Sequence, residues 1–199
     1  MFFKYYTMKK LLAILCFILL LMGCKNQEQK KGEHNHQETK TSNKETPKKK
    51  PLSPHTSAMA MIGDAHIHID YSSPGVRNRI IFGGLLAYDQ VWQAGAHMAT
   101  WIETNKDLQV EGKTLPAGKY GLFTIPSKEE WTVIFNSNWE QHGKDEYDEK
   151  DDVLRFNVQS KISDEITEHL EYRVNKISDE EGTISLTWEK VSINFNVKQ

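Results

Sequence analysis

Two histidines separated by one residue form the most chemically informative pair of side chains in this 199-residue sequence. His66 and His68 lie in the segment 65–71, where apolar and polar residues alternate as in a β-strand. Every second side chain of a strand leaves the same face, so both imidazoles can approach one ion. Neutral imidazole suits a divalent transition metal, and further ligands complete such a site. The candidates for these ligands are Asp70, Glu103, His97 and His142.

The alternative interpretation of the same pattern needs no metal. His66, His68 and Asp70 can form the solvated face of an antiparallel strand whose other face, with Ile67 and Ile69, packs on a core.

Two arginines and two ring-bearing side chains predict a second kind of site. Arg77 and Arg79 follow the turn-forming segment 73–75, and guanidinium groups bind carboxylate or phosphate through paired hydrogen bonds. With Trp92 and His97 they predict a pocket for an anionic or sugar-like ligand, or for a protein partner. The alternative is that the arginines form ion pairs and the tryptophan packs in the core.

Motifs of well-known enzyme classes are missing from the sequence. No glycine-rich phosphate loop follows a predicted strand, and no G-x-S-x-G nucleophile elbow occurs. The acidic stretch 145–152 lacks the ligand spacing of an EF-hand. These observations favour a binding protein over an enzyme, without deciding between them.

The N-terminus predicts where the protein resides. Lys9 and Lys10 precede an apolar run, 11–22, which is shorter than the roughly 20 residues that span a bilayer and matches an export signal. The run ends in Leu21-Met22-Gly23-Cys24, which resembles the bacterial lipobox. The resemblance implies that residues 1–23 are a lipoprotein signal peptide and that Cys24 carries the acyl chains that bind the membrane. We therefore expect a bacterial cell-envelope protein, on the outer membrane facing the periplasm or the cell surface; a plain secretory signal is the alternative.

Composition divides the rest of the chain into a tether and a domain. Residues 24–52 contain almost no large apolar side chain and predict a disordered tether. Residues 55–199 carry fourteen Lys and Arg against twenty-three Asp and Glu, a net charge of −9, which argues against nucleic acid as a partner. Cys16 lies in the predicted signal peptide, so the domain has no thiol for catalysis or metal binding.

Residues 53–199 predict one β-rich domain. Two-residue alternation recurs along this part, most clearly where Val191, Ile193, Phe195 and Val197 are separated by polar residues. Short strands with turn residues between them predict an all-β fold, either an antiparallel β-sandwich or a jelly-roll-like barrel. At most one short helix is expected, over 84–93. Further strands are expected at 100–104, 108–110, 119–125, 131–136, 154–158, 170–174 and 184–188.

Several motifs of the domain resemble a bacterial family catalogued as domain of unknown function 2911. They lie at 70–79, 81–85, 115–120, 122–126 and 131–136. The resemblance implies an exported, often lipid-anchored, mainly β domain with no assigned activity. His97 and the His66-Ile67-His68 triplet depart from the family pattern, so a role for these histidines would belong to a subgroup.

Three functions remain open from the sequence. The leading one is a non-enzymatic, lipid-anchored domain that binds a small-molecule ligand or a protein partner at the surface of Arg77, Arg79, Trp92 and His97. A metal-binding protein or metal-dependent enzyme built on His66 and His68 is the second. A structural component of the envelope is the third.

Overall fold

A computed structural model describes residues 50–199 of the chain. The predicted signal peptide, Cys24 and nearly all of the predicted tether lie outside these residues. No helix in the described part is long and apolar enough to cross a membrane.

The larger of two sheets has six strands, and every neighbouring pair in it is antiparallel. Its order is β1 (His55–Ile62), β2 (Ala65–Ser72), β3 (Trp101–Thr104), β6 (Gly118–Ile125), β7 (Glu130–Asn136) and β8 (Asp152–Gln159). A two-residue turn at Gly63 and Asp64 joins β1 to β2, and Gly63 takes the positive φ of 57° that such a turn favours.

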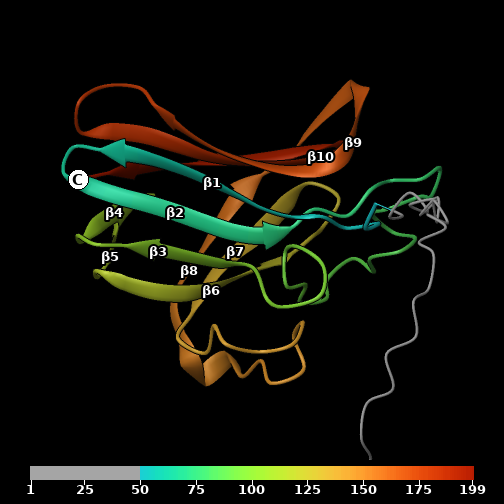
Figure 1. Ribbon diagram of the computed structural model, residues 1–199, viewed down its shortest axis with the longest axis horizontal. Coiled ribbons are helices and arrows are strands. Elements are labelled where there is room, and N and C mark those ends of the chain that lie inside the picture. The colour runs from blue at the N-terminus through green and yellow to red at the C-terminus, as the bar shows by residue number, and fades with distance from the viewer. Residues whose placement is uncertain (1–49) are drawn as a thin grey trace, which may run out of the picture. The chain divides into compact units, whose positions relative to one another are not determined.

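The smaller sheet has four strands and packs on the larger one (Figure 1). Its order is β5 (Lys113–Leu115), β4 (Leu108–Val110), β10 (Glu181–Lys198) and β9 (Lys161–Lys176). Helical structure within 50–199 is limited to a 3₁₀ turn, η1 (Glu149–Asp151). The predicted all-β fold is confirmed, and of its two predicted forms the structure shows the β-sandwich.

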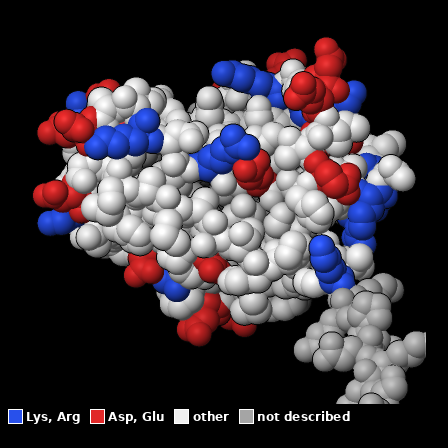
Figure 2. All heavy atoms as spheres, turned by 45° about the horizontal axis from the view of Figure 1, so that its top comes forward, with Lys and Arg blue, Asp and Glu red and all other residues white. Residues whose placement is uncertain are grey.

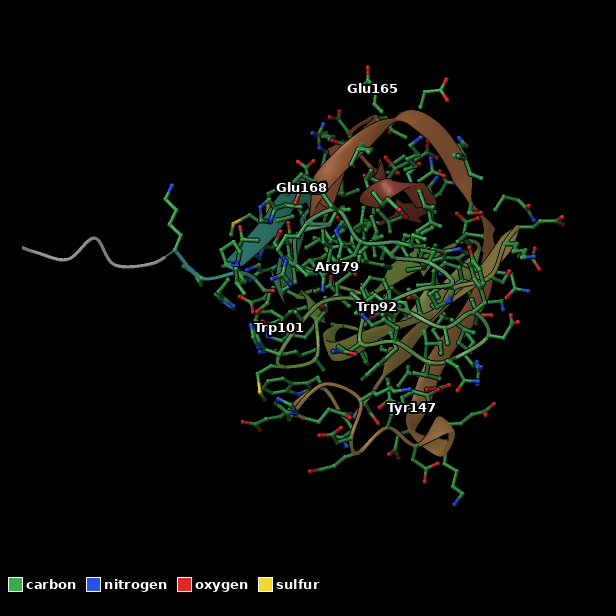
Figure 3. All side chains as sticks on the ribbon, turned by 90° about the vertical axis from the view of Figure 1, so that its right-hand side faces the viewer. Arg79, Trp92, Trp101, Tyr147, Glu165 and Glu168 are labelled. Atoms are coloured by element: carbon green, nitrogen blue, oxygen red, sulfur yellow. The ribbon has the colours of Figure 1, made fainter. Side chains whose placement is uncertain are left out.

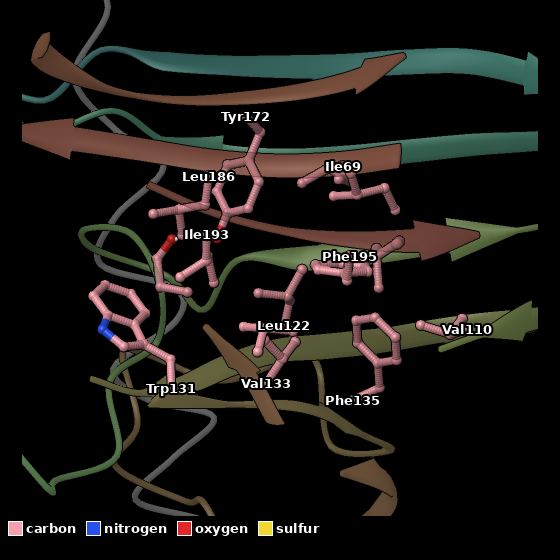
Figure 4. Packing of buried hydrophobic residues seen from close by; sticks show 14 of the residues in the cluster. Ile69, Val110, Leu122, Trp131, Val133, Phe135, Tyr172, Leu186, Ile193 and Phe195 are labelled. Atoms are coloured by element: carbon pink, nitrogen blue, oxygen red, sulfur yellow. Dashed lines mark hydrogen bonds between the residues drawn. The ribbon is translucent and has the colours of Figure 1, made fainter. Parts of the chain in front are cut away.

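The core lies between the sheets and is built from the alternating apolar residues. Figure 4 shows side chains of β9 and β10, such as Tyr172 and Phe195, facing those of the larger sheet, such as Leu122 and Phe135. Phe195 packs edge-on against Phe135 at 6.1 Å between ring centres. Burial of such side chains contributes about 1.5 to 3 kcal/mol each and is the main force that holds the two sheets together.

A bulge in β10 reverses the alternation within one strand. Even-numbered residues up to Trp188 are buried, whereas from Ile193 onward the odd-numbered residues are. The pairing with β9 shifts on both sides of Glu189, which has a φ of 56°. The extra residue keeps both halves of the strand facing one core.

The expected helix over 84–93 is wrong, because this segment forms turns. Asp89 has a φ of 58°, outside the right-handed helical region. Near the end of the segment, the backbone of Trp92 pairs with that of Thr124 on β6. Two strands were also not expected from the sequence, β1 and β5.

A small second cluster covers part of the outer face of the six-stranded sheet. Phe123 and Ile134 pack there with Ala99 and with the half-buried Tyr147. The loop segments that carry Ala99 and Tyr147 shield β6 and β7, so both faces of these strands are buried. On β1 and β2, by contrast, the outer face stays accessible.

Candidate functional site

His66 and His68 lie on the accessible outer face of β2, as the alternation predicts. The inward residues Ile67 and Ile69 are fully buried, whereas His66 is exposed and His68 is half-buried. The two imidazole ring centres are 6.1 Å apart. The strand therefore presents both rings side by side in the direction away from the core.

Two methionines stand beside these histidines on β1. In the antiparallel register Met61 pairs with His66, and Met59 pairs with His68. Directly opposite residues of antiparallel strands have Cβ atoms about 4.5 to 5.5 Å apart on one face of the sheet. The methionine side chains are 56% exposed at Met59 and 47% exposed at Met61, so solvent reaches both. Two thioethers and two imidazoles thus form one patch, here called the Met-His quartet.

An aromatic group on β3 borders the quartet. Trp101 packs edge-on against His68, with 4.9 Å between ring centres. The ammonium of Lys119 on β6 lies 3.5 Å from the centre of Trp101 and 3.7 Å from that of Trp139, so it is held between two indoles. These contacts restrict the rotation of Trp101 and, through it, of the His68 ring.

One nitrogen of His68 has no partner. Its Nε2 is screened from solvent and makes no hydrogen bond with the described residues. Leaving a buried polar group unpaired costs about 1 to 3 kcal/mol, which is unusual in a folded protein. An ion at this nitrogen would remove that cost.

The further ligands expected from the sequence do not gather at the histidine pair. Within residues 50–199 no three His, Cys, Asp or Glu side chains lie close enough together to hold a metal ion. Asp70 shares the outer face, but its carboxylate is 3.0 Å from Nε2 of His55. His142 contacts Asp145 at 3.1 Å on a loop, and Glu103 is the exposed neighbour of His68 on β3. A metal site here therefore needs ligands of another type.

A shallow hollow adjoins the same face. It has a volume of about 230 Å³ and is lined by His55, Asp70, Met98, Trp101 and Trp139, among others. Indole rings and a carboxylate around a small hollow can hold a small polar molecule.

The four residues expected to bind a ligand have separate surroundings. Trp92 is 5% exposed and stacks on Trp188 in the core, with 5.7 Å between ring centres. The guanidinium of Arg79 donates to the carbonyl oxygens of Gly75 and Val76 at 2.6 and 3.0 Å. Trp92 and Arg79 therefore serve the packing and the turn in which they lie.

Arg77 and His97 are both exposed and both have positive φ, 50° and 64°. The backbone N–H of Arg77 donates to a carboxylate oxygen of Glu168 on β9, and the carbonyl of His97 accepts from Gly143. These contacts hold their backbones and leave the two side chains at the surface. In Figure 3, Arg79 and Glu168 lie apart from Tyr147, which is at the far end of the molecule from Glu165.

A polar cluster at that end has a structural role. The Tyr147 hydroxyl donates to Oδ2 of the Asp152 carboxylate at 2.9 Å, and the Arg155 guanidinium lies 3.1 Å from the same oxygen. Burial, followed by the hydrogen bond to Asp152, raises the pKa of Tyr147 well above its usual range. Asn136 donates to the same carboxylate at 2.8 Å. The cluster ties the loop before β8 to the sheet.

Met59 and Met61 are the site residues that the sequence interpretation missed. Methionine on the outward positions of β1 hides the alternation of apolar and polar residues that marks a strand. A local signal was nevertheless present. A two-residue hairpin turn at Gly63-Asp64 requires Ile62 to pair with Ala65, and the register then places each methionine opposite a histidine.

The fold and this face define an all-β sandwich domain that exposes thioether, imidazole and indole groups on one sheet. The chain belongs to the family described as protein of unknown function (DUF2911), whose model matches residues 53–197. The comparison with curated proteins finds no match, and neither does the comparison with solved structures.

Proposed function

We propose that this chain is a lipid-anchored, metal-binding protein of the bacterial cell envelope. Its β domain binds a transition-metal ion through His66 and His68, and the acyl chains on Cys24 attach it to a membrane. This second of the three functions considered from the sequence is preferred because of one observation. The unpartnered Nε2 of His68 lies in a pair of outward-facing imidazoles on an accessible sheet face.

The anchor is supported by the sequence alone. A basic segment, an apolar run too short to span a bilayer, and the lipobox-like tetrapeptide ending at Cys24 occur in the order of a lipoprotein signal. Two or more acyl chains suffice for stable attachment without a spanning helix. The location that we propose is the outer membrane, with the domain in the periplasm or at the cell surface.

Charge argues against nucleic acid as the partner. Residues 55–199 carry a net charge of −9, from fourteen basic and twenty-three acidic side chains. Figure 2 shows the two signs interspersed on the visible face, without a continuous basic patch that would follow a phosphate backbone.

Metal analysis of the purified full-length chain tests the proposal. We expect metal to co-purify in a fixed ratio after growth with added zinc, nickel and copper, and to be lost in the His66→Ala/His68→Ala variant. The matched control is His34→Ala/His36→Ala, which removes another His-x-His pair from the same chain. Loss in the control with retention in the first variant would place the metal elsewhere, and a metal-free wild-type chain would refute the proposal.

A small-molecule ligand is the second candidate function. The hollow lined by Trp101, Trp139 and Asp70 favours it, because the indole rings give a small polar molecule an apolar wall and Asp70 gives it a hydrogen-bond acceptor. A thermal-shift screen of sugars, carboxylates and phosphates should then show stabilisation that Trp139→Ala removes. If no compound shifts the unfolding temperature, this candidate fails.

A further inference from the structure

We propose that the ion bound at this face is Cu(I), held by the Met-His quartet of Met59, Met61, His66 and His68. The inference rests on the proposed metal-binding function and names both the metal and two further ligands. It assigns a role to the two exposed methionines, which a site built from carboxylates and imidazoles alone leaves unused.

The register of the hairpin brings the four side chains together. Met61 lies directly opposite His66, and Met59 lies directly opposite His68, on adjacent strands and on the same face. Successive pairs on one face of the sheet are separated by two residues, about 6.6 Å along the strand. A single ion above the centre of this rectangle is within reach of all four flexible or rotatable side chains.

The spacing of the imidazole rings suits one ion between them. Metal–nitrogen bonds are about 2 Å long, which places the ion about 3 Å from a ring centre. Two rings that share one ion therefore have centres about 5 to 6 Å apart, and the observed separation is 6.1 Å. The two rings are therefore close enough for one ion to bind both once a nitrogen of each ring turns toward it.

The ligand chemistry selects the metal. A thioether is a soft, polarisable donor, and soft sulfur ligands select Cu(I) over harder divalent ions. Zinc sites use thiolate, imidazole and carboxylate ligands, usually four of them. Within residues 50–199 no His, Cys, Asp or Glu completes a metal-holding group of three at the histidine pair, and this includes Glu103, the cross-strand neighbour of His68. Two imidazoles completed by two neutral thioethers form a set that fits Cu(I) better than Zn²⁺.

The surroundings support binding at this place. Both methionines are about half exposed, so an ion can reach them without opening the core. On the other side, Trp101 packs against His68 and orients its ring. The ammonium of Lys119 already occupies the space between Trp101 and Trp139, so we expect the indole to act as a wall and not as a ligand.

Competition with a coloured Cu(I) chelator under anaerobic, reducing conditions tests the inference. The sample is the full-length chain in detergent, carrying Cys16→Ser and Cys24→Ser so that no thiolate competes for the ion. We expect one Cu(I) per chain. Loss of groups that merely orient metal ligands weakens binding by about 10- to 100-fold, so Met59→Leu/Met61→Leu should weaken it at least tenfold.

The matched control is Met98→Leu, because Met98 is also exposed, at 53%, but lies outside the hairpin. It should leave the Cu(I) affinity unchanged. X-ray absorption of the loaded chain should show sulfur and nitrogen neighbours, and the sulfur signal should vanish in the double methionine variant. Leucine keeps the volume of methionine, and an unchanged unfolding temperature would confirm that the fold is intact.

The outcomes separate this inference from the proposed function. Equal Cu(I) affinity in wild type and in the double methionine variant would overturn the assignment of the sulfurs as ligands. Binding of Zn²⁺ or Ni²⁺ through His66 and His68 without binding of Cu(I) would overturn the inference and keep the proposed function. If no ion binds, both fail.

Discussion

At the scale of single residues, the structure separates side chains that face solvent from those used internally. Trp92, with its ring in the core, and Arg79, bound to two backbone carbonyls, are used internally. His68 is the opposite case, because it keeps a screened nitrogen without a partner on an otherwise open face. The difference follows from hydrogen bonding. Polar groups that contribute to the fold are paired, whereas a ligand gains the most binding free energy at a group that has no partner.

Tyr147 gives a prediction at this scale. Its hydroxyl donates to the Asp152 carboxylate, which is 5% exposed, so Tyr147→Phe should lower the free energy of unfolding by about 1.5 kcal/mol. Urea unfolding at pH 7 measures this. Tyr88→Phe is the control, because the Tyr88 hydroxyl makes no hydrogen bond within residues 50–199. An equally large loss of unfolding free energy in Tyr88→Phe would contradict the stabilising role of the hydrogen bond from Tyr147 to Asp152.

The raised pKa of Tyr147 adds a pH dependence with a definite sign. In the unfolded chain the hydroxyl ionises near its usual pKa of about 10, and in the folded chain it ionises at higher pH. Its stabilising contribution is therefore complete below about pH 10 and is lost as the pH rises toward the folded pKa. We therefore expect the difference in the free energy of unfolding between wild type and Tyr147→Phe to shrink above pH 10. A difference that stays constant to the end of the measurable range would show that the pKa is not raised.

At the scale of elements, the β1–β2 hairpin brings together the side chains of the proposed site. The turn at Gly63 sets the pairing, and the pairing puts sulfur and nitrogen donors on one face. The C-terminal residue supports the turn: the side-chain oxygen of Gln199 accepts hydrogen bonds from Asp64 and Ala65, the latter at 2.9 Å. In Figure 1 the C-terminus accordingly lies beside this turn.

Two glycines with positive φ provide a matched test of the turn. Gly63 has a φ of 57° and a Cβ there would collide with Gln199, whereas Gly112, with a φ of 75°, has nothing within 4 Å of such an atom. Gly112→Ala should lower the free energy of unfolding by about 1 kcal/mol, because alanine is strained in the left-handed conformation. For Gly63→Ala we expect about 2 to 3 kcal/mol, because the support from Gln199 is also lost. Denaturant unfolding of both variants compares them, and equal losses would mean that Gln199 does not support the turn.

At the scale of the whole molecule, the sandwich core and the site are separate. The core lies between the two sheets, while the Met-His quartet is on the outer face of one of them, so its residues can vary without altering the core. The quartet and the proposed anchor are also separated along the chain, since the predicted tether of residues 24–52 links Cys24 to the domain.

Lipid attachment gives the prediction for the whole chain. Cells grown with an alkyne analogue of palmitate should incorporate the label into the wild-type chain, and Cys24→Ser should abolish incorporation because the acyl chains are bound through that sulfur. Cys16→Ser is the matched control and should keep the label, since Cys16 lies in the predicted signal peptide. Label that persists in Cys24→Ser would refute the anchor.

The fold class, most of the strands and the outward direction of His66 and His68 could be predicted from the amino-acid sequence alone. These features are local, because alternation along an extended backbone decides which face a side chain takes. The prediction of a helix at 84–93 was wrong, because a positive φ at Asp89 and the pairing of Trp92 with β6 override the local pattern.

Which side chains contribute to the fold, and which lie together at the proposed site, depends on tertiary packing. Trp92 stacks on Trp188, nearly one hundred positions further along the chain, and no local pattern encodes that contact. The methionines are an intermediate case. Their pairing with the histidines follows from a local turn, but their exposure depends on packing, because no loop of residues 50–199 covers the outer face of β1 and β2.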